Sequence, residues 1–567
     1  MSTAPEPFPR QEGPEVAAAS AWLESLAAAL IESLPRLYGT EVDPALSALI
    51  KALTEALAAG SVSLDLQGPI PAGLDPDLWP DGYRRLLLED PLSQRHDGPL
   101  VLDQDRLSWR RWHQLRQDVI ESLVQRARAT LEPPMAAAAG EHALAIAAAA
   151  GLDRRQQQAV LALLQGPLVL LEGGPGTGKT STVVQMLAAL LRWQPQARVH
   201  LAAPTGKAAA RLRQAIQAGG QRLEPAMSER LAALSCTTLH RLLESRGERF
   251  GRDRSHPLPL DLLVVDELSM VDLPLMAALL EALPDDCRLV LAGDAAQLPP
   301  VGPGAVLQEL QRRHQDLGEA AITLTTTYRN QGAIAAVAQQ LRQLPSDEAP
   351  LAGLGLDRLD PAANLEWLQA SARSLPPLVR DTLQKRSEAL ARAAQALSGR
   401  LDAADAAGQR SLLAGDLAAD LLAAQEQLAV LTPVRQGRWG LEAIHRALLG
   451  PALEQGPQAW PAGTPVLCER NRSDLDLANG DLGVMLVLAA GRQVLFAGAG
   501  TGPPRLIPAA LLGDVRPAHA LTVHKAQGSE MDTVIVLLPT GLRDERRLLY
   551  TALTRARRRA VLITPSP

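Results

Sequence analysis

The spacing of apolar residues along this chain changes near residue 150. Before that point they repeat every three or four residues from Ala17 to Ala59 and again from Trp109 to Thr130, which predicts helices. Between them, Pro99–Trp109 predicts two short strands around a turn. Residues 1–15 are polar and Pro-rich, so we expect them to be disordered, and Pro133-Pro134 predicts a linker.

Beyond Gly151, short Val- and Leu-rich runs alternate with helical segments. Continuous apolar strands between helices are typical of a parallel sheet covered on both faces, and the length allows two such sheets. Residues 340–425 are helical in pattern and carry no recognisable chemistry. The expected strands are Leu168–Leu171, Val199–Ala203, Leu262–Val265, Leu289–Ala292, Ile322–Thr325, Leu428–Thr432, Val466–Cys468, Thr533–Leu538 and Ala560–Ile563.

Composition narrows the class of protein. The chain has 567 residues, 47% hydrophobic and 21% charged, which is ordinary for a globular protein of several domains. Its net charge of −6 argues against a broadly basic coat but allows a local basic groove. The N-terminus lacks a secretory pattern, no stretch reaches ~18 uncharged apolar residues, and the three cysteines lack metal spacing. We therefore expect a cytoplasmic protein.

The strongest local signal is the octapeptide Gly173–Thr180, which fits the phosphate-binding P-loop between a strand and a helix. Its glycines let backbone N–H groups converge on phosphate at a helix N-terminus. Lys179 can reach the β- and γ-phosphates of ATP, and the Thr180 hydroxyl can bind Mg²⁺. The expected nucleotide contacts here are Gly173, Gly174, Pro175, Gly176, Thr177, Gly178, Lys179, Thr180 and Ser181.

Two further strands end in acidic residues. Asp266-Glu267 follows Leu262–Val265, and acids at the carboxyl end of a parallel strand lie at the edge where ligands bind. Asp266 can hold the Mg²⁺ shell, and Glu267 can position and deprotonate the attacking water. The next strand ends in Gly293-Asp294, and Gln297 beyond it could reach a γ-phosphate or water.

These segments, with others in the same order, resemble the superfamily-one DNA helicases and, within them, the RecD branch, which includes the α chain of exodeoxyribonuclease V. The resemblance covers about residues 150–567. The matching segments are Leu152–Val160, Gly173–Thr180, Leu201–Leu212, Thr237–Leu243, Val264–Val271, Gly293–Val301, Thr325–Asn330, Leu431–Gly440, Asn479–Gly483, Ala520–Glu530 and Leu549–Ala556.

The resemblance raises the expectation for several roles at the ATP site. It implies that Gln156 reads the adenine edge and that Tyr328 stacks on the base. Gly528 and Glu530 would contact the γ-phosphate and the ribose respectively. Arg329 and Arg555 would be arginine fingers carried by the second sheet, which stabilise charge on the transferring phosphoryl group. Closing and opening of the two sheets around ATP would then convert hydrolysis into stepping along DNA.

We expect DNA contacts from loops on the other edge of the two sheets, because hydroxyls, imidazoles and a lysine suit contacts to phosphates. A lone histidine is more often structural, but His240 lies within a matching Thr-x-His segment. His524 has no second ligand at a suitable spacing to suggest a metal site. The expected DNA-binding residues are Thr205, Thr238, His240, Thr522, His524 and Lys525.

The resemblance implies two RecA-like parallel-sheet domains, a small SH3-like β-barrel insertion and a mainly helical N-terminal domain. We expect the domains at residues 1–145 (partner docking), 146–332 (first motor domain), 333–482 and 518–567 (second motor domain) and 483–517 (insertion). Gly98–Arg111 resembles the N-terminal domain of the subunit form, which docks on RecB-like and RecC-like chains; the aromatics usual there are partly replaced, at Ser108 and His113.

Three functions remain open. The first is an ATP-dependent 5′→3′ helicase subunit of the RecBCD complex, acting on single-stranded DNA and duplex ends in double-strand-break repair. The second is a stand-alone helicase, although residues 1–150 lack the Gly-x-Gly hairpins of such proteins. The third is an ATP-gated subunit without motor activity, against which the intact hydrolytic set argues. No paired-carboxylate nuclease motif is present, so nuclease chemistry would lie in a partner chain.

Overall fold

The computed structural model describes residues 14–130, 137–247, 249–328, 332–344, 351, 354–356, 363–472, 474–498, 502–542 and 545–566. They form two compact units. The first unit contains residues up to 122 together with the segments 271–280 and 300–309; the second contains the rest. Of the stretch 1–15 that we expected to be disordered, residues 1–13 lie outside the described residues, as does the linker at Pro133-Pro134. For Pro14 and Glu15 the expectation was wrong, because they begin a helix. Within the described part, no helix is long and apolar enough to cross a membrane.

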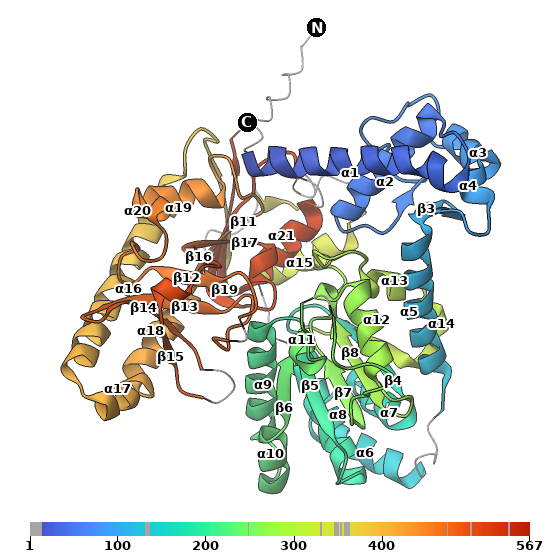
Figure 1. The fold of residues 1–567 in the computed structure, drawn as a ribbon. Coiled ribbons are helices and arrows are strands. Elements are labelled where there is room, and N and C mark those ends of the chain that lie inside the picture. Colours follow the sequence, from blue (N-terminus) through green and yellow to red (C-terminus); the bar gives the residue numbers. More distant parts are fainter. Residues whose placement is uncertain are drawn as a thin grey trace. The chain divides into compact units, whose positions relative to one another are not determined.

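The N-terminal region packs helices around a small antiparallel sheet of order β1-β3-β2 (Figure 1, blue). The two strands expected within Pro99–Trp109 are confirmed as β2 and β3, paired around a turn. The elements are α1 (Pro14–Tyr38), α2 (Pro44–Ala58), β1 (Leu64–Asp65), α3 (Asp81–Glu89), α4 (Pro91–Gln94), β2 (Leu100–Asp103), β3 (Arg106–Trp109) and α5 (Arg110–Arg128).

The single helical pattern expected over Ala17–Ala59 is two helices. The break follows from residues that end one helix and start the next: Gly39 has a φ of +67°, and Pro44 is the first residue of α2. The Asp43 side chain accepts a hydrogen bond of 2.7 Å from the Ala45 N–H, which caps α2. Periodicity alone continues through this break because both helices place apolar residues on the same core.

Within the first unit, an arginine of β3 joins the N-terminal region to the segment 300–309. The Arg106 guanidinium makes two hydrogen bonds to the Glu309 carboxylate, of 3.0 and 2.8 Å, and two to the Ser63 hydroxyl. The Gly304 N–H also donates to the Gly60 carbonyl at 2.9 Å. A bidentate, half-buried pair of this kind orients the two segments as well as attracting them.

The first motor domain is a six-stranded, wholly parallel sheet of order β6-β5-β7-β8-β4-β9 (Figure 1, cyan to yellow-green). The central strands β4, β7 and β8 are buried along their whole length, as a sheet covered on both faces requires. Its elements are α6 (Ala137–Ala149), α7 (Arg154–Gln165), β4 (Leu168–Gly173), α8 (Lys179–Trp193), β5 (Val199–Ala203), α9 (Gly206–Gly220), α10 (Pro225–Ala232), β6 (Ser235–Thr238), α11 (Leu239–Leu242), β7 (Leu262–Val265), α12 (Leu273–Ala282), β8 (Arg288–Gly293), α13 (Val306–Arg312), α14 (His314–Leu317) and β9 (Ala321–Leu324).

The second motor domain is a five-stranded parallel sheet of order β10-β19-β18-β11-β17. Three of its strands were expected; β10 and β17 were not, because each is short or mixed in pattern. Its elements are α15 (Ala333–Gln343), β10 (Leu365–Ala370), α16 (Pro377–Ala403), α17 (Ala406–Leu413), α18 (Asp416–Glu426), β11 (Leu428–Thr432), α19 (Leu441–Leu449), α20 (Ala452–Gln455), β17 (Ala520–Thr522), β18 (Met531–Leu537), α21 (Glu545–Leu553) and β19 (Ala556–Pro565).

A separate antiparallel sheet of order β15-β14-β13-β12-β16 is inserted between β11 and β17. Its strands are β12 (Pro465–Cys468), β13 (Leu482–Leu488), β14 (Gly491–Phe496), β15 (Arg505–Pro508) and β16 (Val515–Pro517). The placement of Val466–Cys468 in a parallel sheet was therefore wrong: β12 pairs antiparallel with both β13 and β16. An apolar run of four residues carries no information about strand direction, which its pairing partners decide.

Candidate functional site

The P-loop lies between the carboxyl end of β4 and the start of α8. Gly176 and Gly178 have φ values of +74° and +82°, a conformation that favours glycine. The Lys179 ammonium donates to the carbonyls of Gly173 and Gly174 at 2.6 and 3.2 Å. The Thr177 hydroxyl donates to the Gly174 carbonyl at 2.8 Å. The loop therefore encloses its own lysine, whose ammonium is bound by two loop carbonyls.

The carboxyl edge of the same sheet collects the acidic side chains. Asp266 follows β7 and Asp294 follows β8, which lies next to β4 and its P-loop. Burial and the neighbouring Glu267 carboxylate raise the pKa of Asp266 to about 6, while Lys179 opposes this rise. Asp266 and the P-loop lysine thus interact electrostatically at this edge of the sheet.

Glu267 has an unusual backbone. Its φ is +55°, in the left-handed region that residues with a Cβ rarely adopt. A short 3-10 turn, Leu268–Met270, follows at once, and the Met270 N–H donates to the Glu267 carbonyl at 3.0 Å. Such strain persists only where the surrounding structure enforces it, and it re-aims the Glu267 side chain relative to a regular strand end.

The segment after β8 is bound by residues of the second motor domain. The Tyr550 hydroxyl, from α21, donates to an Asp294 carboxylate oxygen at 2.6 Å. The Leu298 N–H donates to the Thr551 hydroxyl at 2.9 Å, and the Gln527 amide donates to the Leu298 carbonyl at 3.0 Å. The Leu298 side chain itself packs in the core of the second motor domain. This segment thus connects the two parallel sheets directly.

Gln297, in the same segment, is 5% exposed. Its amide nitrogen donates to Asp294 at 3.4 Å, whereas its Oε1 is buried without a hydrogen-bond partner among the described residues. Buried acceptors are normally satisfied, so this oxygen is available to a group that enters the site.

Two of the expected adenine contacts lie against the P-loop. The Tyr328 N–H donates to the Gly176 carbonyl at 2.8 Å, and the half-exposed Tyr328 ring approaches Gly178. The Tyr328 hydroxyl donates to Asp153 at 2.9 Å. Gln156 is buried. In the capping box of α7 its side chain accepts from the Asp153 N–H, and its amide donates to the Thr177 carbonyl at 3.3 Å. Arg329 lies outside the described residues.

Arg555 is 3% exposed and is fixed within the second motor domain. It donates to the carbonyls of Thr551 and Ser529, each at 3.2 Å, and it interacts electrostatically with Arg211 and Tyr550. Arg211, on α9, interacts in turn with Glu267 and Asp266. Arg555 therefore belongs to the group of charges around Asp266 and Glu267, although in this structure its donors are used by its own domain.

Gly528 and Glu530 lie beside α9. Gly528 has a φ of +69°, and a Cβ there would lie 3.0 Å from the Ala208 Cβ and 3.5 Å from the Thr205 hydroxyl. Glu530 forms ion pairs with Arg211 and Arg557. Burial lowers the pKa of Arg211 to about 10, and Glu267 is the largest opposing influence. Sequence reasoning did not select Arg211, because it is one of several arginines on a polar helix face.

The expected DNA-binding residues do not lie on the opposite edge of the sheets, so that expectation was wrong. Thr205 follows β5 and Thr238 ends β6, so both lie at the carboxyl edge that also carries the P-loop, displaced along it by the strand order. Each caps a helix through its hydroxyl: α9 at the Ala208 N–H and α11 at the Arg241 N–H, both at 3.2 Å. The His240 ring lies 6.3 Å from that of Phe250.

The remaining candidates follow β17. The Thr522 hydroxyl accepts from the Lys525 N–H at 3.2 Å, and the Lys525 ammonium donates to Asn479 at 2.9 Å. His524 lies in the same short 3-10 turn as Lys525. Lys525 borders a hollow whose other lining residues sequence reasoning missed, because they come from three separate segments: Arg435, Glu469, Arg470, Gly513, Asp514, Val515 and Arg516.

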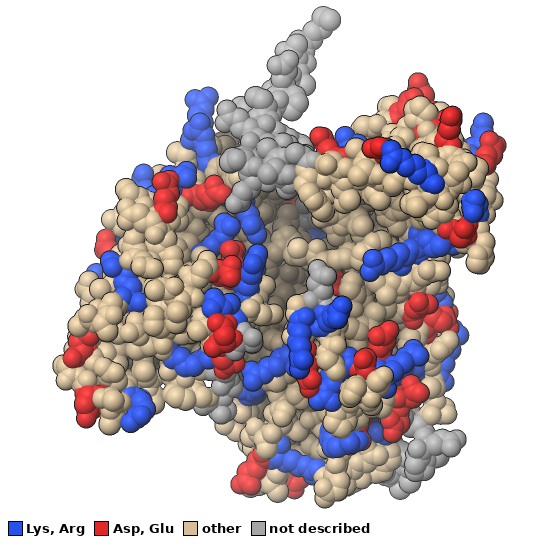
Figure 2. Space-filling view, in the orientation of Figure 1, with Lys and Arg blue, Asp and Glu red and all other residues tan. Residues whose placement is uncertain are grey.

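On the face shown in Figure 2, basic side chains are interspersed with acidic ones, in keeping with the negative net charge. The hollow beside Lys525 has the same mixture, because Arg516 pairs with Glu469 at 2.7 Å and Arg470 with Asp514 at 3.8 Å. No group of three or more His, Cys, Asp or Glu residues suited to a metal ion occurs within the described ranges.

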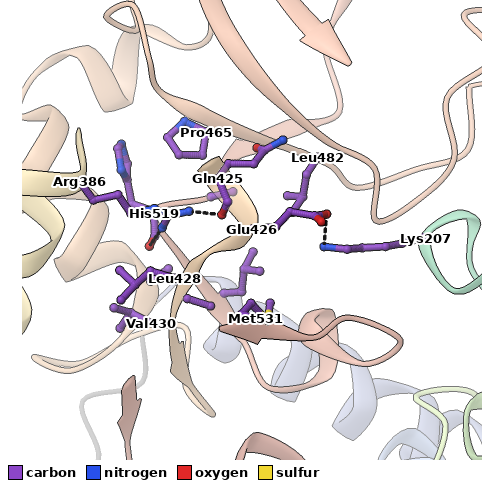
Figure 3. A pocket seen from close by; sticks show the side chains of 14 residues that line it. Lys207, Arg386, Gln425, Glu426, Leu428, Val430, Pro465, Leu482, His519 and Met531 are labelled. Carbon is purple, nitrogen blue, oxygen red and sulfur yellow. Dashed lines mark hydrogen bonds and ion pairs between the residues drawn. The ribbon is translucent and has the colours of Figure 1, made fainter. Parts of the chain in front are cut away.

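A second cavity is lined by residues of β11, β17 and neighbouring segments (Figure 3). Arg386 and His519 meet there, and Lys207 of α9 forms an ion pair of 3.1 Å with Glu426 of α18. Both ring nitrogens of His519 are buried without a hydrogen-bond partner among the described residues. Burial and the charge of nearby Arg386 hold the pKa of His519 well below its usual value.

Comparison with known proteins agrees with this architecture. Residues 156–303 match the family model described as an AAA domain, and residues 517–563 match the UvrD-like helicase C-terminal domain. The chain is 36% identical over 553 residues to the RecBCD enzyme subunit RecD of Mycobacterium tuberculosis, covering 92% of this chain and 88% of the relative. It is 34% identical to the protein of that name from Mycolicibacterium smegmatis, covering 92% and 90%.

A third relative is the ATP-dependent RecD2 DNA helicase of Deinococcus radiodurans, 32% identical over 464 residues, which cover 79% of this chain and 54% of that protein. Two parallel sheets, the first of which carries a P-loop, together with these matches define a superfamily-one DNA helicase with ATPase activity. Within that class, the chain belongs to the RecD family.

Proposed function

We propose that this chain is the 5′→3′ motor subunit of a RecBCD-type complex, acting from duplex ends in the cytoplasm during double-strand-break repair. The observation that carries the motor assignment is the direct connection between the two parallel sheets. The segment Asp294–Leu298 follows β8 of the P-loop sheet and forms hydrogen bonds with Tyr550, Thr551 and Gln527 of the second motor domain. A change at the γ-phosphate can therefore be transmitted to the second motor domain through bonded side chains.

The nucleotide site supports hydrolysis as well as binding. The P-loop residues Gly173–Ser181 would hold the phosphates, Tyr328 would stack on the adenine and Gln156 would read its edge. Glu267 would take the proton from the attacking water, which Gln297 would orient with its unpartnered Oε1. Arg329 and Arg555 would stabilise the charge that develops on the γ-phosphoryl group, and Gly528 and Glu530 would contact the nucleotide as the domains close.

The residues present suit Mg²⁺. Hydroxyl and carboxylate oxygens are the ligands that Mg²⁺ prefers, and Thr180 and Asp266 offer one of each at the same sheet edge. When bound, the ion neutralises charge on the β- and γ-phosphates. Burial and the neighbouring Glu267 carboxylate raise the pKa of Asp266 to about 6, and a bound cation would lower it again.

For DNA, we propose that the strand passes over the ends of β5, β6 and β17. Thr205, Thr238, His240, Thr522, His524 and Lys525 would contact its phosphates there. Such contacts position a strand without reading its sequence, as a translocating motor requires. The antiparallel insertion adjoins this path through Asn479, which accepts from Lys525.

The N-terminal domain, residues 1–145, would dock on RecB-like and RecC-like chains. The relatives of highest coverage carry the name of a RecBCD subunit, and the similarity extends over 92% of this chain. The remaining domains would lie close to those that the sequence predicts, at 146–332, 333–482 with 518–567, and 483–517. The exception is β12 (Pro465–Cys468), which pairs within the antiparallel sheet and so belongs with the insertion.

Unwinding of tailed duplexes tests the proposal. The purified chain is given ATP and a duplex with either a 5′ or a 3′ single-stranded tail, first alone and then with RecB-like and RecC-like chains. We expect unwinding of the 5′-tailed substrate to depend on those partners and to be abolished in the complex carrying Lys179→Ala.

Unwinding of the 5′-tailed duplex by the chain alone would favour the stand-alone helicase instead. If Lys179→Ala left unwinding unchanged with every combination of chains, the motor assignment would be refuted. A chain that hydrolyses no ATP with any partner would support the ATP-gated alternative.

A further inference from the structure

Arg342 is a basic residue that no sequence motif selects, yet it lies at the nucleotide site. It is near the end of α15, in the second motor domain. A Cβ built on Gly174 of the P-loop would collide with the Arg342 Nη1 and approach its Cζ to 3.7 Å. The guanidinium of Arg342 therefore lies directly on the P-loop backbone of the other motor domain.

The position along the P-loop indicates which phosphate is involved. Lys179 donates to the carbonyls of Gly173 and Gly174, so its ammonium lies at this same end of the loop. A P-loop lysine reaches the β- and γ-phosphates, whereas the α- and β-phosphates lie nearer the backbone N–H groups that lead into the helix. Arg342 is thus placed where the γ-phosphate is expected.

The present partner of Arg342 is a weak one. Its Nη1 lies 3.9 Å from Asp294 Oδ1, within ion-pair range but beyond a hydrogen bond. Asp294 is 1% exposed, and its oxygens already accept from the Ala296 N–H, the Gln297 amide and the Tyr550 hydroxyl. The Arg342 side chain remains 32% exposed and makes no hydrogen bond to any residue in the described part of the chain.

The backbone that carries Arg342 is firmly held. Ile334, Val337 and Leu341 of α15 are buried in the core of the second motor domain. The Arg546 guanidinium, on α21, donates to the Leu344 carbonyl at the end of α15. The guanidinium is therefore presented by a rigid helix, and a shift of its contacts is transmitted to the second domain as a whole.

We propose that Arg342 is a γ-phosphate-contacting arginine, which leaves Asp294 for the terminal phosphate of ATP when the nucleotide binds. This inference rests on the proposed ATP site and extends it by a residue. A phosphate offers unoccupied oxygens with more negative charge, and guanidinium donors bind such oxygens in pairs. Departure of Arg342 leaves Asp294 to Tyr550, Gln297 and the Ala296 N–H, so the same event alters the link between the two sheets.

The test compares a nucleotide with a terminal phosphate to one without it. Binding of ATPγS and of ADP to the full-length chain is measured by titration calorimetry with Mg²⁺, for the parent, Arg342→Gln, Arg342→Lys and the exposed control Arg392→Gln. We expect Arg342→Gln to lower the ratio of ATPγS affinity to ADP affinity about tenfold, because a charge-assisted contact is lost. Arg342→Lys should keep part of the preference, and Arg392→Gln all of it.

An unchanged affinity ratio in Arg342→Gln, with a parent-like melting temperature, would overturn the inference while leaving the proposed function intact. If that variant does not fold, Arg342→Lys decides: a ratio equal to that of the parent counts against the contact, and a reduced one supports it. A parent chain that binds neither nucleotide, or binds both as Lys179→Ala does, would refute the ATP site itself and the inference with it.

Discussion

The hydroxyl of Tyr550 and the carboxylate of Asp294 form a hydrogen bond of 2.6 Å, although 256 residues separate them in the chain. Both side chains are 1% exposed. Asp294 ends a strand beside the P-loop, whereas Tyr550 lies on the helix that leads to Arg555. The burial of both groups and the negative charge of Asp294 hold the pKa of Tyr550 well above its usual value, so the phenol is a donor at neutral pH.

Tyr550→Phe removes this donor and keeps the ring. We expect a loss of about 1–3 kcal/mol in the free energy of unfolding, because the Asp294 carboxylate loses a partner where water cannot replace it. ATP hydrolysis should also become less dependent on DNA, since the bond joins the two sheets. Urea unfolding and ATPase assays with and without single-stranded DNA measure these effects.

Tyr38→Phe is the matched control, because the structure gives the Tyr38 hydroxyl no hydrogen bond within the described ranges. If Tyr550→Phe were as stable as that control and equally stimulated by DNA, the bond would have no part in coupling.

Glu267→Gln keeps the size of the side chain but removes its basicity. We expect ATP to bind as it does to the parent and hydrolysis to slow by about 10²-fold or more, the usual effect of losing a general base. Phosphate release, together with nucleotide binding, distinguishes these two steps. Glu281→Gln, on the exposed side of α12, should leave both unchanged. Near-normal turnover in Glu267→Gln would assign the base elsewhere.

Arg555→Lys preserves a positive charge but not the planar guanidinium. We expect hydrolysis to slow by about 10³-fold while nucleotide affinity changes little, as for other arginine fingers. Arg555→Ala is the less clean variant, because Arg555 also donates to the Ser529 and Thr551 carbonyls. The neighbouring exposed Arg558→Ala serves as the control. A rate within a few-fold of the parent in Arg555→Lys would contradict the finger role.

Stability should fall in mild acid because of two buried histidines. The His445 Nε2 accepts from the Ala520 N–H at 3.4 Å, so this ring is neutral, and its burial lowers its pKa to about 4. The His519 ring lies 6.2 Å away, beside Arg386 (Figure 3), and its pKa is also lowered by burial. The unfolded chain binds these protons at its usual pKa, near 6.5, whereas the folded chain does not.

The stabilisation is therefore complete above pH 6.5 and decreases as the pH falls towards 4. We expect His445 alone to account for about 2 kcal/mol between pH 7 and pH 5. Urea unfolding at both values, for the parent and for His445→Gln, measures this difference, which should be smaller in the variant. Equal pH dependence in the two proteins would show that His445 is protonated in the fold.

Much of the architecture was predictable, because the central strands are apolar throughout and lie between amphipathic helices. β5, β7 and β11 have the predicted bounds. The misplaced strand β12 is equally apolar, but its neighbours in the antiparallel sheet come from later in the chain. Thr205 was assigned to the wrong edge although it follows a predicted strand of a parallel sheet, whose carboxyl end lies at the P-loop edge. Thr238 ends β6, a strand that the sequence did not predict.

By itself, the sequence determined the nucleotide chemistry. The P-loop, Asp266 and Glu267 are local features, each fixed by the residues of one strand end and the turn after it. Only the tertiary structure decided which residues of the second sheet meet them. Tyr550, Arg211 and Arg342 lie on ordinary helix faces, where a tyrosine or arginine carries no local signal. Their proximity to the site depends on how the strands pair and the helices pack, which are contacts between residues far apart in the chain.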